Sequence, residues 1–259
     1  MSDSVITEIN GVIATVTLNA PERLNALNKD SWHQLGKAIA TLSTNDDLRC
    51  VVLRGAGDKA FAAGADIKEF ETERADSTQA KKYGELVAKT MAAVAACRHP
   101  TVAMIKGACV GGGLEIAACC DLRICGQSSR FGIPVKRLGL VMAHAELEML
   151  VALVGRSRAL EIILEGEIFG ADKAFELGLV NRIVPDDEVE HESYATADRI
   201  AEGAPLAARW HKEFALRLMD PQPLTEVERD RGYACFDTQD FKTGVAAFVA
   251  KKNPDFKGE

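Results

Sequence analysis

The sequence predicts an α/β fold with a C-terminal helical region. Stretches with strand periodicity alternate with amphipathic helical stretches as far as about Pro185, and only helical patterns follow, out to Phe248. The chain has 259 residues, of which 47% are hydrophobic, enough to bury a full core. From this change in pattern we expect a core over residues 1–195 and a helical region over residues 196–259. No low-complexity linker separates the two regions.

The first element is expected to be a β-hairpin. Residues 5–9 and 12–18 alternate in polarity on either side of Asn10-Gly11, a pair typical of a type I′ turn. Residues 55–64 are rich in glycine and are expected to form a loop. Helices are then expected over residues 29–42, 78–96, 114–120, 143–153, 158–164 and 171–177, and strands over residues 49–54, 101–106, 122–125 and 179–184.

The segment around Glu115 is the one most suited to chemistry. It reads Lys-Gly-Ala-Cys-Val-Gly-Gly-Gly-Leu-Glu over residues 106–115, an apolar strand, three glycines and an acid at the start of a helix. Glycines leave the backbone N–H groups at a helix N-terminus open to an oxygen that gains negative charge. A carboxylate beside such an oxyanion hole suits the transfer of a proton at the carbon next to a carbonyl.

Composition excludes several functional classes. The formal charge of −7 gives no general attraction to nucleic acid or anionic lipid, so neither partner is expected. The seven cysteines are odd in number and lack metal-ligand spacing, which predicts reduced thiols, no disulfide framework and no metal site. The N-terminal residues have no basic segment followed by an apolar run, and no apolar run is long enough to cross a membrane. We therefore expect a cytoplasmic protein.

The chain resembles the crotonase, or enoyl-CoA hydratase/isomerase, superfamily. The similarity is carried in order by residues 19–27 (Asn-Ala-Pro-Glu-Arg-Leu-Asn-Ala-Leu), 60–69 (Ala-Phe-Ala-Ala-Gly-Ala-Asp-Ile-Lys-Glu), 107–115, 171–185 and 248–256. This resemblance implies a crotonase-like spiral of repeated ββα units, with C-terminal helices that assemble a homotrimer or a dimer of trimers. It also implies an acyl-CoA thioester as substrate, with coenzyme A as part of that substrate and no separate cofactor.

The resemblance also assigns residues. It implies that the backbone N–H groups of Ala65 and Gly112 hold the thioester oxygen and that Glu115 is catalytic. Residues 72–83 and the C-terminal helices are expected to shape the acyl pocket. The positions implied to bind substrate are Arg23, Leu24, Ala26, Ala63, Asp66, Ile67, Lys68, Gly111, Pro134, Val135, Phe248 and Lys251.

One departure bears directly on mechanism. Family hydratases carry a second catalytic glutamate 20 positions after the first, and that position here is Val135. A valine can neither accept a proton nor orient water, so slow hydration by the usual two-acid route is expected.

The following segment offers substitutes for the second acid. Residues 142–149 read Met-Ala-His-Ala-Glu-Leu-Glu-Met, and on a helix His144 and Glu148 would share one face while Glu146 points elsewhere. The resemblance makes His144 the first candidate for the second acid/base, ahead of Glu146, because it matches a turn that faces the acyl pocket in the family, and an ion pair without a catalytic role is the alternative.

Three functional classes are compatible with these residues. The first is hydration, dehydration or double-bond migration on an acyl-CoA through an enolate, and it is favoured by Glu115 beside the glycines. The second is hydrolysis or carbon–carbon cleavage of an acyl-CoA on the same fold. The third is a non-catalytic CoA- or RNA-binding protein, which the acidic charge and the presence of Glu115 disfavour.

Overall fold

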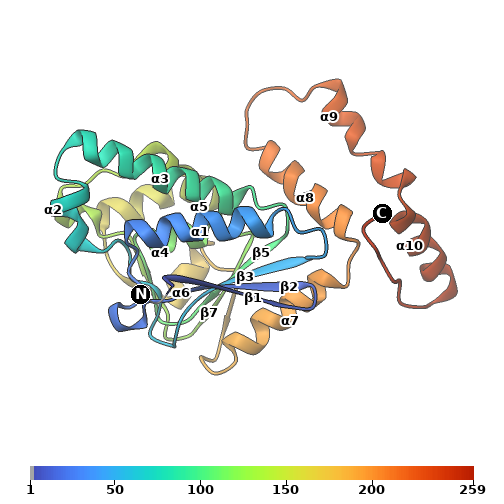
Figure 1. Ribbon diagram of the computed structural model, residues 1–259, viewed down its shortest axis with the longest axis horizontal. Helices are drawn as coiled ribbons and strands as arrows, with labels where there is room; N and C mark the ends of the chain where they lie inside the picture. The colour runs from blue at the N-terminus through green and yellow to red at the C-terminus, as the bar shows by residue number, and fades with distance from the viewer. Residues whose placement is uncertain (1–2) are drawn as a thin grey trace.

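A computed structural model describes residues 3–259 and confirms the α/β core with a C-terminal helical region (Figure 1). Met1 and Ser2, which belong to the expected core, lie outside the described residues. The expected hairpin is present, with β1 (Val5–Asn10) antiparallel to β2 (Ile13–Leu18). The prediction of a type I′ turn is wrong. Asn10 pairs with Ile13, so the central residues are Gly11 and Val12, and only Gly11 has positive φ, as in a type II′ turn.

A six-stranded sheet forms the centre of the core. Its strand order is β1-β2-β3-β5-β7-β10, in which all pairs but β1–β2 are parallel. The strands after the hairpin are β3 (Cys50–Gly55), β5 (Thr101–Ile105), β7 (Leu122–Gly126) and β10 (Arg182–Val184). The strand expected over residues 179–184 is therefore shorter than predicted and begins at Arg182.

A second sheet of four short strands was not predicted from the sequence. Its order is β4-β6-β8-β9, from β4 (Ala60–Ala62), β6 (Ala108–Val110), β8 (Arg130–Gly132) and β9 (Phe169–Gly170). β4 lies inside the stretch that was predicted to be a loop. Three successive units run from the first sheet to the second and then into helix: β3-β4-α3, β5-β6-α4 and β7-β8-α5. These units are the ββα repeats expected from the resemblance.

Helices cover both faces of the six-stranded sheet because alternate strand residues point to opposite sides. On one face Ala14, Val51 and Ala103 belong to the main hydrophobic core, with α1 (Lys29–Leu42), α3 (Ser77–Ala95) and α4 (Gly112–Cys119). On the other face Ile13, Val52 and Val102 meet Val189 and Ala197 of α7 (Val189–Ala201). The remaining core helices are α2 (Phe70–Glu73), α5 (His144–Glu165) and α6 (Ala171–Glu176).

The long element α5 is interrupted where two helices were expected. Gly155 has φ 79° and ψ 159°, which is not helical, and it separates the first part of α5 from the second. Glycine tolerates this positive φ because it has no Cβ. The two predicted helices over residues 143–153 and 158–164 are therefore confirmed.

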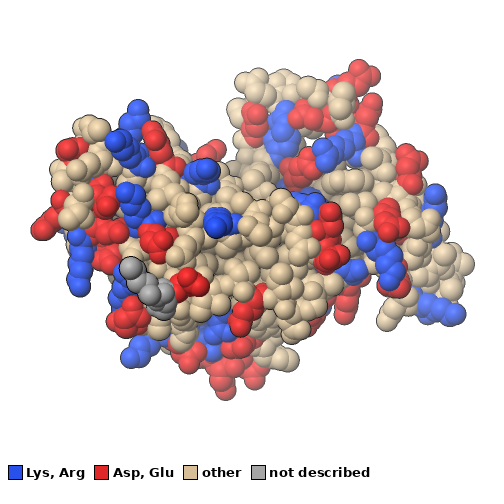
Figure 2. Space-filling view, viewed as in Figure 1, with Lys and Arg blue, Asp and Glu red and all other residues tan. Residues whose placement is uncertain are grey.

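The C-terminal helices project from the core as an arm (Figure 1). The arm contains α8 (Pro205–Arg217), α9 (Glu226–Arg231) and α10 (Gln239–Ala250). α7 runs through the boundary predicted after residue 195 and packs against the core sheet, so the arm departs only after Ala201. Figure 2 shows basic and acidic side chains interspersed over core and arm on the face in view.

Two largely buried cationic side chains of α8, Lys212 and Arg209, form polar contacts between the arm and the core. Lys212 of α8 has a side chain that is 8% exposed, and its Nζ lies 2.7 Å from Asp121 Oδ2 and donates to His99 O at 3.1 Å. Arg209 donates to Leu48 O at 3.1 Å. These contacts connect α8 to three segments of the core, at Leu48, His99 and Asp121.

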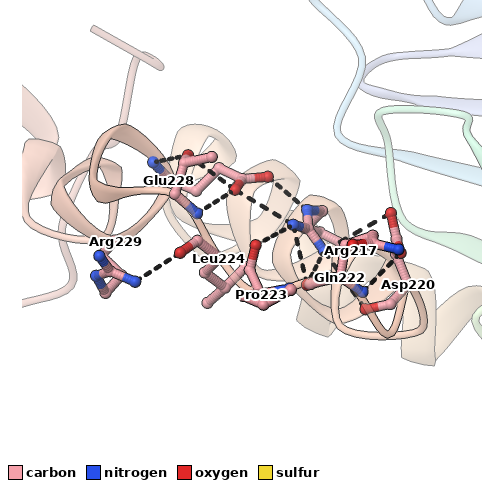
Figure 3. A network of polar contacts seen from close by, with 8 residues as sticks. Arg217, Asp220, Gln222, Pro223, Leu224, Glu228 and Arg229 are labelled. Atoms are coloured by element: carbon pink, nitrogen blue, oxygen red, sulfur yellow. Dashed lines mark hydrogen bonds and ion pairs between the residues drawn. The ribbon is translucent and has the colours of Figure 1, made fainter.

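A polar network shapes the connection from α8 to α9 (Figure 3). Arg217 at the end of α8 forms an ion pair with Glu228 in the first turn of α9 and donates to Pro223 O at 3.2 Å. Glu228 also accepts from the Thr225 N–H at 2.7 Å. Together these bonds, chiefly the Arg217 side-chain bond, hold the pKa of Glu228 at about 2.

Over residues 3–259, every helix is too short or too polar to span a lipid bilayer.

Candidate active site

A small cavity lies beside the four-stranded sheet, at the N-termini of α4 and α5. Its volume is about 150 Å³. Its walls are mostly apolar, and three charged side chains reach it, Arg74, Glu115 and Glu146. The remaining lining residues are Trp32, Ala63, Gly64, Ala65, Ile67, Phe70, Val87, Val110, Gly111, Gly112, Pro134, Val135, Leu138, Leu140 and Met142.

Backbone pairing places the loop that contains Ala65. The Leu27 N–H donates to Gly64 O at 2.8 Å, and the Asp66 N–H donates to Leu27 O at 2.8 Å. The N–H of Ala65, between these two bonds, donates to no backbone carbonyl within residues 3–259. Gly64 has φ +103°, and a Cβ there would lie 3.2 Å from Val110 O. Only glycine therefore lets this loop approach the glycine segment so closely.

The glycine segment forms the opposite wall. Gly111 precedes α4 with φ 52°, and the Gly112 N–H, at the first position of α4, has no backbone acceptor in the described part of the chain. A Cβ on Gly113 would lie 2.3 Å from Ala62 O, so the missing side chain lets α4 pack directly on β4. Unpaired N–H groups from two loops thus line one cavity.

Glu115 lies in the first turn of α4, as predicted, although the helix begins two residues earlier than expected. The residue is 8% exposed and its carboxyl group has no hydrogen-bond partner within residues 3–259. Burial, with a smaller contribution from the negative charge of Glu146, raises the pKa of Glu115 to about 8, and the positive charge of Arg74 opposes the shift. At neutral pH this carboxyl group is therefore mostly protonated.

Glu146 is the second carboxylate of the cavity. It lies in the first turn of α5, and its Oε2 accepts from the Ala143 N–H at 2.7 Å, which closes the helix N-terminus. Glu146 lies on a different face of α5 from His144 and Glu148, as expected, and this is the face that lines the cavity. His144 and Glu148 do share a face, but both are exposed and neither lines the cavity. The packing of α5 against the core selects the Glu146 face instead.

Arg74 was not singled out from the sequence, although the segment expected to shape the acyl pocket contains it. It follows α2, and its guanidinium carbon lies 3.7 Å from the centre of the Tyr83 ring and 4.8 Å from that of Phe70. The only indication of Arg74 in the sequence was that it is the basic residue of the otherwise acidic stretch Glu69-Phe-Glu-Thr-Glu-Arg74. The C-terminal helices, also expected to shape the pocket, contribute no lining residue from this chain.

The structure separates the predicted substrate-binding residues into two groups. Ala63, Ile67, Gly111, Pro134 and Val135 line the cavity together with Ala65 and Gly112, and Val135 packs against the core from the start of a short 3₁₀ helix. The others lie outside the lining. Of these, Arg23 pairs with Asp66 at 3.0 Å, Leu24 accepts from the Ala63 N–H at 3.0 Å, and Ala26 and Lys68 flank the same two segments.

Phe248 and Lys251 lie far from the cavity of their own chain. Phe248 is on α10 and Lys251 caps it, and Figure 1 shows α10 on the opposite side of the molecule from α2. Phe248 is 86% exposed. Within one chain these residues do not reach the cavity.

Comparison with known proteins places the chain in a family. The family model described as enoyl-CoA hydratase/isomerase matches residues 8–259. A crotonyl-CoA hydratase of Syntrophomonas wolfei is 33% identical over 98% of both chains. A short-chain-enoyl-CoA hydratase of Clostridium acetobutylicum is 34% identical over 96% of both.

Comparison with solved structures supports the same family. An enoyl-CoA hydratase/carnithine racemase from Magnetospirillum magneticum superposes with a TM-score of 0.98 at 50% identity and covers 100% of this chain and 97% of its own. An enoyl-CoA hydratase/isomerase family protein from Hyphomonas neptunium has a TM-score of 0.94 at 33% identity, covering 99% of this chain and 98% of its own. The chain therefore belongs to the enoyl-CoA hydratase/isomerase family of enzymes.

Proposed function

We propose that this enzyme adds water to the double bond of a short-chain enoyl-CoA thioester, and catalyses the reverse dehydration, through an enolate. The observation that carries the proposal is the grouping of two carboxyl side chains, Glu115 and Glu146, with two unpaired backbone N–H groups around one small cavity. A cavity of about 150 Å³ is well below the roughly 300–1,000 Å³ of sites for larger ligands, which favours a short acyl group.

The backbone N–H groups of Ala65 and Gly112 form the proposed oxyanion hole. Each would donate a hydrogen bond to the thioester oxygen as it gains charge in the enolate. Because the N–H groups are fixed by the backbone, no reorganisation accompanies the reaction, and each donor contributes about 3 kcal/mol to the lowering of the barrier. The position of Gly112 at the start of α4 adds the favourable potential of the helix N-terminus.

The two carboxyl groups divide the proton transfers. Two nearby titratable groups in different environments commonly take opposite acid and base roles. Glu115, protonated at neutral pH, donates its proton to the α carbon, and the Glu146 carboxylate accepts a proton from the water that attacks the β carbon. One proton and one hydroxide are thereby added across the double bond, and exchange with solvent restores both side chains.

An assay with crotonyl-CoA tests the reaction. We expect loss of the enoyl absorbance and formation of 3-hydroxybutyryl-CoA, with the thioester intact. Release of free coenzyme A would instead support hydrolysis, and formation of the 3-enoyl isomer would support double-bond migration. If neither crotonyl-CoA nor a longer enoyl-CoA is converted, the proposal is wrong.

The proposal includes a homotrimer, or a dimer of trimers, assembled through the arm. Large apolar side chains are exposed on and next to α10, among them Tyr233 at 70%, Phe248 at 86% and Val249 at 78%, more than an isolated chain would leave in water. Phe248 and Lys251 could then reach the site of a neighbouring copy. Sedimentation velocity should give the mass of three or six chains, and a monomeric active protein would contradict this part of the proposal.

The proposal also includes the cytoplasmic location. All seven cysteines are unpaired thiols and six are buried, which suits a reducing compartment.

A further inference from the structure

Arg74 is held in a fixed position at the cavity wall. Its guanidinium lies over the ring of Tyr83, which is 3% exposed, and beside the ring of Phe70. The Tyr83 hydroxyl is itself fixed, because it donates to Glu69 Oε2 at 3.0 Å. Stacking on two aromatic side chains orients the planar guanidinium and limits its motion.

This cation has no acidic partner. Among residues 3–259 Arg74 forms no ion pair, whereas Arg23 on the neighbouring loop is paired with Asp66 at 3.0 Å. The Nε of Arg74 is buried without a hydrogen-bond acceptor, so the donors left to meet a ligand in the cavity are those of the two Nη nitrogens. A fixed guanidinium with free N–H groups is suited to bind a carboxylate through two parallel hydrogen bonds.

The charges around the cavity are compatible with an anionic ligand. Glu115 has a pKa of about 8 and is mostly uncharged at neutral pH. The charged groups that line the cavity are then the Arg74 guanidinium and the Glu146 carboxylate. Arg74 lies in the segment that connects α2 to α3, and it lines the same cavity as the N–H groups of Ala65 and Gly112. The acyl chain of a ligand held by those N–H groups at its thioester would lie in the cavity that Arg74 lines.

We propose that Arg74 is a specificity residue that binds an anionic group at the distal end of the acyl chain, so that the preferred substrates are short acyl-CoA thioesters with a second carboxylate. This assignment rests on the proposed function, because it takes the thioester to lie at Ala65 and Gly112. It adds a substrate class that the chemistry at Glu115 and Glu146 does not specify.

Binding of two saturated thioesters tests the assignment without turnover. Glutaryl-CoA and pentanoyl-CoA have acyl chains of equal length and differ by a terminal carboxylate in place of a methyl group. Calorimetric titration of the full-length protein should show glutaryl-CoA binding about tenfold more tightly, the scale of one charged hydrogen-bonded pair after desolvation. Arg74→Gln should abolish this preference, and Arg74→Lys, which keeps the charge without the fork, should retain part of it.

The ratio of the two affinities is the readout, because contacts with coenzyme A and any general loss of binding cancel from it. Arg156→Gln, at an exposed arginine of α5 outside the cavity, changes the net charge equally and should leave the ratio as in the wild type. Equal affinities in the wild type, or a glutaryl-CoA preference that survives in Arg74→Gln, would overturn the Arg74 assignment alone. Failure of both thioesters to bind the wild type would overturn the proposed function as well.

Discussion

Glu115 and Glu146 face one cavity from the first turns of two different helices, and the charge of Glu146 helps to raise the pKa of Glu115 to about 8. Burial is the larger cause of this shift. The acid that the resemblance leads one to expect at position 135 is a valine, so the second carboxyl group of the cavity comes from the following helix.

Replacement of Glu115 should remove most of the activity. We expect Glu115→Gln to lower kcat for crotonyl-CoA by at least about 100-fold, because the amide cannot donate the required proton. Affinity for a saturated thioester should change little. Glu165→Gln, at an exposed glutamate near the end of α5, is the matched control and should behave as the wild type. Comparable turnover by Glu115→Gln would exclude Glu115 from the mechanism.

A second comparison distinguishes the three candidates for the other acid/base. Glu146→Gln should lower kcat by about 100-fold while its amide oxygen still accepts from the Ala143 N–H, so the start of α5 is preserved. His144→Ala and Glu148→Gln should leave kcat within about twofold of the wild type, because both side chains are outside the cavity. A large loss of kcat in His144→Ala together with an active Glu146→Gln would reverse the assignment.

The stability of the fold should depend on the proton of Glu115. Because its folded pKa of about 8 lies above the 4.5 that is usual for a glutamate, the folded state binds a proton that the unfolded state has released between these pH values. The free energy of unfolding should therefore fall as pH rises from about 4.5 to about 8, by several kcal/mol. Denaturant unfolding of wild type and Glu115→Gln should show that the variant lacks this part of the decline. Parallel pH profiles would contradict the buried acid.

The rate of hydration should depend on the protonation state of Glu115. If protonated Glu115 is the acid, kcat/KM for crotonyl-CoA should decline as pH rises through about 8. In Glu146→Gln the repulsion by the neighbouring charge is removed, so the residual activity should decline at a lower pH. A rate that instead rises through pH 8 would identify Glu115 as the base.

Two glycine replacements separate a site effect from a helix effect. Gly64→Ala places a Cβ at φ +103° and 3.2 Å from Val110 O, so the loop that carries Ala65 must shift and kcat should fall by about 10-fold or more. Gly84→Ala, within α3 and with no neighbour within 4 Å of the added Cβ, should stabilise the protein by about 0.5–1 kcal/mol and leave kcat unchanged. Wild-type kcat in a folded Gly64→Ala would argue against the proposed oxyanion hole.

Local sequence patterns determined the longer elements and indicated the segment that holds the candidate site. The apolar spacing of α1 gives its limits, Lys29–Leu42, because a helix that buries one face must repeat with the helical period. The glycines before Glu115 indicated an open helix N-terminus in the same way. The strands β4, β6 and β8 were missed or left undefined because three residues are too few to show a period, and pairing between distant segments forms them.

Tertiary packing decided which side chains meet in the cavity. The sequence placed His144 and Glu148 on one face of a helix and Glu146 on another, and this grouping was right. Which face looks toward Glu115 depends on how α5 packs against the core, and no pattern within α5 carries that information. Arg74 likewise reaches the cavity because Tyr83 and Phe70 hold it there. Periodicity encodes the faces of an element, whereas the partner of each face is set by contacts between residues distant in the chain.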